Sequence, residues 1–435
     1  MILRDKYLKK LIASKNNGFP KVITGVRRCG KSYLLKEIYR SYLLKNGVLN
    51  KNIIVIELDD DKNVNLRNPL ELGKHVRKLC ERKRNCYVFI DEIQLVDTII
   101  NPIYTDGKIV FAKHGEEHTI SFVDVILGLS REKNIDLYVT GSNSKMLSSD
   151  VITEFRDKAT NIHLQPLSFE EYYNYVGGYK EEAMFDFIKY GGMPLAVLKP
   201  EEEKSEYLIS LFKKTYFRDI LEHNNIDKTE ALDELCNVIS DCVGELINNE
   251  KISNTFKSVK KENIDKDTVG KYINYFVDSF ILSEVTRYDI KGKRKIGALR
   301  KYYFVDTGLR NARLNFSKFD EGHLIENLVY NELIYNGYTV NVGTYNRVEK
   351  NKNKESIKKT YEIDFYAIRG TEKLYIQIAS DISNIETKER EIKPFKHIND
   401  GVKKVLVVNR PLKEINDDNG YTIIGLTDFL LRFIK

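Results

Sequence analysis

The sequence predicts an α/β fold built on a parallel sheet, and two observations carry this prediction. Helical segments separate the apolar runs of the first 165 residues, and helices between buried strands imply a parallel, doubly wound sheet. The runs themselves are apolar at nearly every position, as strands covered on both faces are. They are residues 21–25, 52–58, 87–90, 136–140 and 161–165.

Length and composition describe a folded protein of more than one domain. At 435 residues the chain exceeds what one hydrophobic core supports, and this length predicts about two to four domains. Hydrophobic residues make up 42% and charged residues 31% of the chain, which is typical of globular proteins rather than disordered ones. The formal net charge of +7 is mild for this length, so it permits a nucleic-acid partner without requiring one.

The sequence also predicts a cytoplasmic protein that does not enter a membrane. Its five cysteines include no CxxC pair and no cysteine–histidine cluster with zinc-finger spacing, as expected in a reducing compartment. The N-terminus carries charge where a signal peptide has its apolar region. No apolar run approaches the roughly 18 residues that a membrane span needs.

Residues 25–32 read Gly-Val-Arg-Arg-Cys-Gly-Lys-Ser and match the phosphate-binding pattern GxxxxGK[ST] at every position. Gly25 and Gly30 let the backbone curl so that successive N–H groups point at a phosphate, and the following helix adds its partial positive charge. We expect Lys31 to reach the β- and γ-phosphates and Ser32 to ligate Mg²⁺. The other residues predicted to contact the nucleotide are Val26, Arg27, Arg28, Cys29 and Tyr33.

Two carboxylates, Asp91 and Glu92, end the apolar run 87–90. At the carboxyl edge of a parallel sheet, Asp91 would lie beside Ser32 and hold Mg²⁺ through water. Glu92 is placed to polarise the attacking water as a general base. The acid pair therefore favours hydrolysis of the nucleotide over binding alone.

A polar turn follows the apolar run 136–140. If this run lies between the two motif strands, a side chain at its end can touch the γ-phosphate and the attacking water. Ser142 or Asn143 could serve as this sensor, and we take Asn143 as the catalytic candidate.

Together these residues resemble the AAA+ superfamily, and in particular the prokaryotic ATPases, archaeal and bacterial, whose AAA+ module precedes a C-terminal region of unknown function. The resemblance implies ATP and Mg²⁺ as ligands, a helical lid, and a homo-oligomer assembled through nucleotide-bound interfaces. It covers nearly the whole chain, through residues 23–32, 89–94, 139–147, 166–172, 216–220, 301–312 and 362–365.

The resemblance also implies an arginine that stabilises charge in the transition state. Arg156 is the leading candidate for this arginine finger. The relatives usually have arginine where this chain has Lys158, and lysine cannot make the same bidentate contact. Arg218 is a second candidate, with a helix-surface salt bridge as its alternative role.

The whole chain is thus predicted to be a P-loop AAA+ core followed by three smaller domains. The core covers residues 1–165, and a helical lid covers 166–228. A winged-helix domain is expected at 229–312, and a degenerate restriction-endonuclease-like α/β domain at 313–435.

The predicted winged helix consists of two helices within 251–280 and a following β-hairpin. Lys271 on the second helix and the basic hairpin tip would contact DNA phosphates. The alternative is a protein-docking winged helix with solvated lysines. The tip residues are Lys293, Arg294 and Lys295, and the side chains expected in the core are Val269, Tyr272, Ile273, Phe276 and Phe280.

The last predicted domain resembles nucleases that assemble two acids, or an acid and a glutamine, with a lysine around Mg²⁺. Glu326, Asp364 and Gln377 match the carboxylate and amide positions, but Ala379 stands in the place of the lysine. Lys373 is the nearest alternative cation along the strand. We therefore expect a nuclease fold whose active site is impaired or absent.

The leading functional hypothesis is an ATP-driven switch or motor whose C-terminal half recognises double-stranded DNA or a protein partner. Two alternatives stay open, namely an ATP-gated, Mg²⁺-dependent nuclease and a signalling ATPase that binds only protein. Residues 101–121 are expected to form an inserted hairpin or lid loop, and residues 348–359 an exposed loop.

Overall fold

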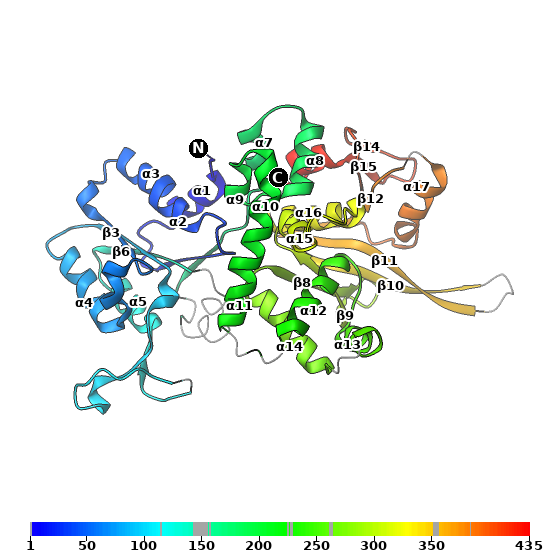
Figure 1. Cartoon of the computed structure of the whole chain (residues 1–435). Coiled ribbons are helices and arrows are strands. Elements are labelled where there is room, and N and C mark those ends of the chain that lie inside the picture. The colour runs from blue at the N-terminus through cyan, green and yellow to red at the C-terminus, as the bar shows by residue number, and fades with distance from the viewer. Residues whose placement is uncertain are drawn as a thin grey trace. The chain divides into compact units, whose positions relative to one another are not determined.

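The computed structural model describes residues 2–113, 115–141, 155, 158–223, 226, 229–260, 264–350, 356–382 and 384–435 (Figure 1). The chain forms two compact units. The first consists of Met1–Gln165 with Asp278–Phe280, and the second of Pro166–Val277 with Ile281–Lys435. Within these described ranges, no helix combines the length and apolar character needed to cross a bilayer.

The first unit is built on a five-stranded parallel sheet with the strand order β2-β3-β6-β1-β7. Every strand of the sheet overlaps one of the five apolar runs, so the predicted parallel α/β fold is confirmed. Strand β6 pairs with both β1 and β3, and it therefore separates the strand before the glycine-rich loop from the strand that carries the acid pair. The strands are β1 (Lys21–Thr24), β2 (Ile53–Glu57), β3 (Cys86–Asp91), β6 (Ile135–Thr140) and β7 (Thr160–His163).

Helices cover both faces of this sheet (Figure 1). The larger core lies against α4 (Pro69–Cys80) and α5 (Phe122–Ser130), whose side chains pack with alternate residues of the strands. On the other face the continuous helix after the glycine-rich loop brings Tyr39 against Phe89 and Tyr138. This helix comprises α2 (Lys31–Tyr33), η1 (Leu34–Tyr39) and α3 (Arg40–Lys45), and α1 (Asp5–Ser14) packs beside it.

The segment 101–121 is an insertion flanked by two short antiparallel strands, β4 (Ile99–Ile100) and β5 (Thr119–Ile120). This arrangement agrees with the expected inserted hairpin. Several large apolar side chains of the insertion are exposed, with Ile103 at 83% and Phe111 at 64% of their surface.

The second unit begins with a helical region and continues into an eight-stranded mixed sheet. The first helices are α7 (Phe169–Val176), α8 (Lys180–Tyr190), α9 (Pro194–Val197), α10 (Glu201–Leu211), η7 (Phe212–Phe217) and α11 (Arg218–His223). The strand order is β14-β15-β13-β12-β11-β10-β8-β9. Their bounds are β8 (Leu282–Asp289), β9 (Arg294–Phe304), β10 (Thr339–Lys350), β11 (Ser356–Arg369), β12 (Glu372–Ala379), β13 (Lys403–Val408), β14 (Ile415–Asn416) and β15 (Thr422–Gly425).

The Gly191–Gly192 turn is fixed by a buried carboxylate from a distant part of the chain. Asp306 accepts a hydrogen bond from the Gly192 N–H at 2.6 Å and caps α15 (Thr307–Arg313) through the Leu309 N–H. Burial raises the pKa of Asp306 to about 6. A side chain on Gly308 would collide with the backbone, because its Cβ would lie 2.0 Å from the Tyr190 carbonyl oxygen. The helical region and α15 are therefore packed backbone against backbone.

Three helices lead into the β8–β9 hairpin: α12 (Thr229–Asp241), α13 (Asn249–Thr255) and α14 (Lys266–Asp278). Ile247, between α12 and α13, forms an isolated antiparallel bridge with Arg300 of β9. Of the side chains expected in the core, Val269, Tyr272, Ile273 and Phe276 of α14 are buried, whereas Phe280, beyond the end of α14, is only half-buried. Strand β8 also pairs in parallel with β10, so the hairpin and the C-terminal strands share one sheet.

The expectation of an exposed loop at 348–359 is wrong for most of its length. Strands β10 and β11 stay paired out to the Lys350↔Ser356 rung and form a two-stranded ribbon. The lysines that suggested a loop are exposed, but a charged side chain does not prevent its backbone from pairing. Val348 and Ile357, both of high strand propensity, lie within this paired region.

Candidate functional site

The loop between β1 and α2 needs glycine at both ends. Gly25 has a φ of 144°, and a Cβ there would lie only 2.2 Å from the Leu164 carbonyl oxygen. Gly30 has a φ of 99° and leads directly into the helix. Both positions favour glycine because they lie in the left-handed half of backbone space. Cys29 is buried between them, and burial raises the pKa of its thiol, which keeps the sulfur unreactive.

The Lys31 side chain folds back over this loop and is 4% exposed. Its Nζ donates to the carbonyl oxygens of Gly25 at 3.0 Å and Val26 at 3.1 Å. The ammonium group is thus held in the concave side of the loop by two neutral acceptors. A phosphate oxygen would be a stronger, charge-assisted acceptor at the same place.

Asp91 lies at the carboxyl end of β3, and hydroxyl groups from two other elements donate to it. The Ser32 Oγ donates to Asp91 Oδ1 at 2.9 Å, and the Thr140 Oγ1 donates to the same oxygen. Asp91 is 7% exposed, so this contact is shielded from bulk water. The structure therefore brings together the two residues predicted to hold Mg²⁺. The sequence did not identify Thr140, the last residue of β6, because a threonine at the end of a buried strand belongs to no recognisable motif.

Lys36 makes a second contact with Asp91 that the sequence did not suggest. Its Nζ is 3.3 Å from Asp91 Oδ2 and also pairs with Glu57, which lies opposite Asp91 in the β2–β3 register. Burial disfavours the charged ammonium group, but the two ion pairs outweigh it and raise the pKa of Lys36. Lys36 follows Ser32 by four residues, so the two side chains lie on the same face of the helix, and this spacing could have identified Lys36 in the sequence.

Glu92 has a left-handed backbone, with φ 55° and ψ 49°. This conformation costs a residue with a side chain on the order of 1–3 kcal/mol, and such strain is concentrated at functional sites. The Glu92 N–H donates to Thr140 Oγ1 at 3.2 Å, which helps to hold the turn. The Gln94 amide donates to the Glu92 carboxylate.

His163, the last residue of β7, lies at the same carboxyl edge of the sheet. Its Nδ1 lies 3.1 Å from the Thr24 Oγ1, at the last rung of the β1–β7 pair. Burial, followed by the positive charges of Lys31 and Lys10, lowers the pKa of His163 to about 4. The imidazole is therefore neutral at pH 7 and adds no charge beside Lys31.

The structure does not describe three of the predicted residues. Ser142, Asn143 and Arg156 lie outside the described residues. Arg218 is exposed on α11 in the second unit, and Lys158 is exposed in the first.

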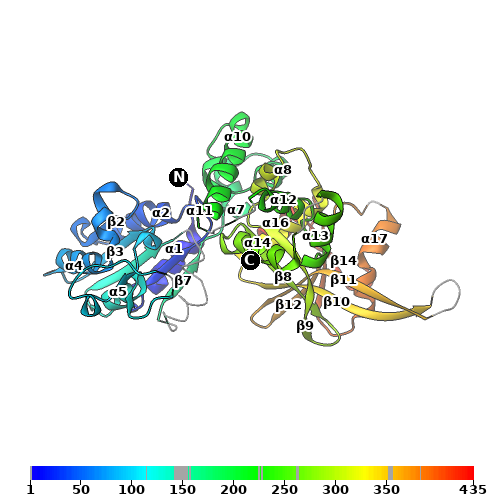
Figure 2. The same cartoon turned by 60° about the horizontal axis from the view of Figure 1, so that its bottom comes forward.

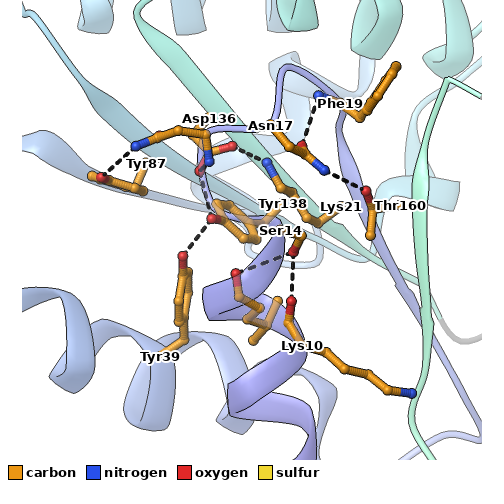
Figure 3. Close-up of polar contacts among 12 residues, drawn as sticks. Lys10, Ser14, Asn17, Phe19, Lys21, Tyr39, Tyr87, Asp136, Tyr138 and Thr160 are labelled. Atoms are coloured by element: carbon orange, nitrogen blue, oxygen red, sulfur yellow. Dashed lines mark hydrogen bonds and ion pairs between the residues drawn. The ribbon is translucent and has the colours of Figure 1, made fainter.

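A buried polar network lies at the amino ends of β1 and β6 (Figure 3). Lys21, which is 0% exposed, pairs with Asp136. Asp136 also accepts from the Tyr138 hydroxyl at 2.7 Å, and Tyr138 and Tyr39 share a 2.6 Å hydrogen bond. Burial lowers the pKa of Lys21 although Asp136 opposes this effect. The network connects the helix that follows the glycine-rich loop with the two central strands.

The second predicted site lies in the second unit. Glu326 of α16 (Glu321–Tyr335), Asp364 of β11 and Gln377 of β12 line one cavity of about 220 Å³, together with Ala379. The Ile378 N–H donates to Asp364 Oδ2 at 2.8 Å, and the Asp364 N–H donates to Gln377 Oε1 at 3.4 Å. Burial, and then the charge of Glu326, raise the pKa of Asp364 well above its usual range.

A buried lysine that the sequence did not suggest lies beside these acids. Lys301 of β9 is 3% exposed, and its Nζ lies 2.8 Å from Glu326 Oε1 and 2.7 Å from Glu362 Oε1. Tyr303 also donates to Glu326, at 2.5 Å. These acids raise the pKa of Lys301 despite its burial. The described part of the chain has no group of three or more His, Cys, Asp or Glu side chains placed to share a metal.

Lys373 does not take the position of the missing nuclease lysine. It is exposed and precedes Gln377 by four positions on β12, which corresponds to about 13 Å along a strand. Lys301 was missed because it lies 25 residues before Glu326 and about 60 before Glu362 in the sequence, and only the folded chain brings β9 next to α16 and β11.

The Lys21–Asp136 pair generates a prediction about stability. Asp136→Ala should lower the free energy of unfolding by about 3–5 kcal/mol, because it leaves a buried ammonium group without its partner. Replacing both residues, as Lys21→Met with Asp136→Leu, should recover most of the loss. Urea denaturation, monitored by tyrosine fluorescence, measures the free energy of unfolding of each variant. Glu132→Ala is the matched control, since the Arg77–Glu132 pair is exposed and worth at most about 1 kcal/mol. A loss in Asp136→Ala no larger than in the control would contradict the prediction.

Comparison with known proteins agrees with this geometry. Residues 17–173 match the family described as an AAA domain, and residues 181–320 match a domain of unknown function. An uncharacterised protein of Haemophilus influenzae is 29% identical over 438 residues, covering 99% of both chains. An uncharacterised protein of Methanocaldococcus jannaschii is 28% identical over 94% of this chain and 84% of its own.

Solved structures give more distant similarities. AMPPCP-bound DnaA from Aquifex aeolicus is 14% identical with a TM-score of 0.30, covering 62% of this chain and 85% of that one. The Aeropyrum pernix ORC1 protein in complex with DNA is 9% identical, also with a TM-score of 0.30, covering 72% and 92%. The family match and the strand order carry the assignment: this chain contains an AAA domain with the P-loop AAA+ α/β fold, followed by a region of unknown function.

Proposed function

We propose that this protein binds ATP with Mg²⁺ at residues 25–33 and hydrolyses it. The observation that carries the proposal is the 2.9 Å hydrogen bond from Ser32 to Asp91 at the carboxyl edge of an AAA-domain sheet. In P-loop enzymes a serine or threonine after the lysine and an acid at the end of a neighbouring strand hold the magnesium. ATP rather than GTP is proposed from the family resemblance.

The loop fits a triphosphate. Gly25 and Gly30 add no side chain to the concave side, and the backbone N–H groups at the start of α2 would donate to an anion bound there. Lys31 would exchange its two carbonyl partners for β- and γ-phosphate oxygens. The ammonium group would then offset the charge that develops during transfer of the γ-phosphoryl group.

The residues around Asp91 fit a magnesium ion. Ser32 would ligate it directly and Asp91 through water. When bound, Mg²⁺ neutralises charge on the phosphate oxygens. Thr140 and Lys36 contact the Asp91 carboxylate and would hold it in position when the ion enters.

Glu92 is the proposed general base. Its strained turn directly follows Asp91, and the Gln94 amide orients its carboxylate. Glu92 would take a proton from the attacking water. Asn143 as sensor and Arg156 as arginine finger remain part of the proposal, with the finger supplied by a neighbouring copy in a homo-oligomer.

We further propose that the second unit recognises double-stranded DNA and that the AAA domain drives or switches this contact. The order α12, bridge strand, α13, α14 and β8–β9 hairpin is that of a winged helix, which supports the proposal. A signalling role with a protein partner alone is the competing proposal, because winged helices also dock proteins.

A nuclease is the second candidate function, favoured by the shared cavity of Glu326, Asp364 and Gln377. Two features oppose it. Ala379 lines this cavity in place of the expected lysine. Lys301 is buried and already paired with Glu326 of the cavity and with Glu362, so it is poorly placed to activate water. We therefore propose a degenerate nuclease-like domain with a binding role.

Steady-state hydrolysis tests the ATPase proposal. Lys31→Ala should lower kcat/KM by at least about 100-fold, because it removes a cation from the transition state. Glu92→Gln should lower kcat by about 100-fold or more while nucleotide still binds. Lys45→Ala, an exposed lysine at the far end of the same helix, should leave the rate unchanged. Equal rates in wild type and Lys31→Ala would refute the assignment.

Repeating the assay with double-stranded DNA tests whether the two units are coupled, and we expect DNA to raise the rate of ATP hydrolysis.

A cleavage assay tests the proposed loss of nuclease activity. Wild-type protein with Mg²⁺ or Mn²⁺ should cut labelled DNA and RNA no faster than Asp364→Ala, which controls for contaminating nucleases. Robust cleavage that disappears in Asp364→Ala would overturn the proposal and favour the ATP-gated nuclease.

A further inference from the structure

Four basic side chains surround a stacked tyrosine pair at the base of the β10–β11 ribbon. The rings of Tyr345 and Tyr361 lie 5.3 Å apart and nearly parallel, at 10°. Lys291 lies 5.1 Å from the Tyr345 ring, and Lys359 lies 5.2 Å from the Tyr361 ring. The other two are Lys393, 5.9 Å from the Tyr361 ring, and Arg347, two residues after Tyr345 on β10. We call Lys291, Arg347, Lys359 and Lys393 the cation cluster.

The cluster gathers charge from four separate elements: the β8–β9 turn, β10, β11 and η9 (Lys393–His397). Three of these cations lie close enough to act on the same histidine, His397. Its pKa is lowered by burial and then by the charges of Arg347, Lys291 and Lys393. Glu349 is the acid that faces them, and it accepts from the Tyr361 hydroxyl. Within the described residues, none of the four cations forms an ion pair with a carboxylate. The cluster therefore carries a net positive charge.

The β10–β11 ribbon carries further exposed lysines beyond the cation cluster. Beyond the Tyr345↔Tyr361 rung, β10 and β11 stay paired through five more rungs, which span about 17 Å. Lys350 and Lys358 are exposed on this part. Figures 1 and 2 both show the ribbon leaving the rest of the sheet.

The tip of the β8–β9 hairpin adds to the same region. The Ile290 N–H donates to the Thr344 carbonyl oxygen at 2.9 Å, so the tip lies beside the strand that carries Tyr345 and Arg347. Lys293, Arg294 and Lys295 are exposed there. Lysines on an exposed strand can serve only to block edge-to-edge aggregation. That role does not explain Lys291 and Lys393, which come from a turn and a helix.

The buried tyrosines decide what kind of anion fits. Tyr345 is 1% and Tyr361 is 5% exposed, so their faces are not available for stacking with unpaired bases. Asn346 and Thr360, polar side chains on the ribbon itself, bond to each other. These features suit regularly spaced phosphates rather than base edges. A two-stranded ribbon also has the width that the major groove of B-DNA admits.

We propose that the cation cluster and the β10–β11 ribbon bind the phosphate backbone of double-stranded DNA without regard to sequence. The inference rests on the proposed function, since it assumes that the second unit contacts DNA. It moves the main contact from Lys271 on α14 to the ribbon and its base.

Binding of the full-length protein to labelled duplexes of two unrelated sequences, followed by fluorescence anisotropy over a salt series, tests this. Replacing Lys291, Lys359 and Lys393 by glutamine should weaken binding to both duplexes at least about 10-fold and reduce the salt slope by about 3. The matched control replaces Lys213, Lys214 and Lys373, three exposed lysines elsewhere in the second unit, and should change affinity less than about 2-fold.

The outcomes separate the inference from the proposed function. If the cluster variant keeps the wild-type salt slope while Lys271→Gln loses binding, the inference fails and DNA recognition through α14 stands. Failure of the wild type to bind any duplex would refute both, and would favour the protein-partner alternative while leaving the ATPase test unaffected. Equal competition by single-stranded DNA, compared per phosphate, would contradict the choice of a duplex. A far-UV circular dichroism spectrum and a urea denaturation curve equal to those of the wild type show that the cluster variant is folded.

Discussion

The Asp91 carboxylate is the contact on which the site in the first unit depends. It joins the end of β3 to the first turn of the helix through Ser32, and to the end of β6 through Thr140. A single residue therefore fixes the relative position of the loop, the central strand and the strained turn at Glu92. Lys36 Nζ lies 3.3 Å from the other carboxylate oxygen, so both oxygens of this largely buried side chain have partners. The proposed magnesium ion would bind at this same contact.

The second unit depends on another buried ionic contact, that of Lys301 with Glu326 and Glu362. Removing a partner from such a pair is costly, so Glu326 and Glu362 hold β9, β11 and α16 together through Lys301. Because β8 pairs with β10, the hairpin belongs to the same sheet as the C-terminal strands, which brings the hairpin tip to the base of the ribbon.

Much of the first unit could be predicted because its signals are local. Buried parallel strands are continuously apolar, and the glycine-rich loop needs its residue types at fixed spacing, so both are visible in a single sequence. Thr140, Lys36 and Lys301 were not found in this way, because each acts through a partner distant in sequence that only the folded chain brings close. The ribbon at 348–359 was mistaken for a loop, since charge suggests exposure but does not report backbone pairing. The roles of Asn143 and Arg156 stay predictions, because both lie outside the described residues.

The most direct test of the central claim is the affinity for ATP, measured by calorimetry with and without Mg²⁺, in wild type and in Asp91→Asn. The substitution keeps the size of the side chain and can keep its contacts with Ser32 and Thr140, but it removes the charge that faces the ion. We predict that Mg²⁺ tightens binding to the wild type at least about 10-fold and has little effect on Asp91→Asn, while binding without Mg²⁺ stays within about 3-fold between the two proteins. Equal tightening by Mg²⁺ in both proteins would contradict the assignment of Asp91 and Ser32 as the magnesium site.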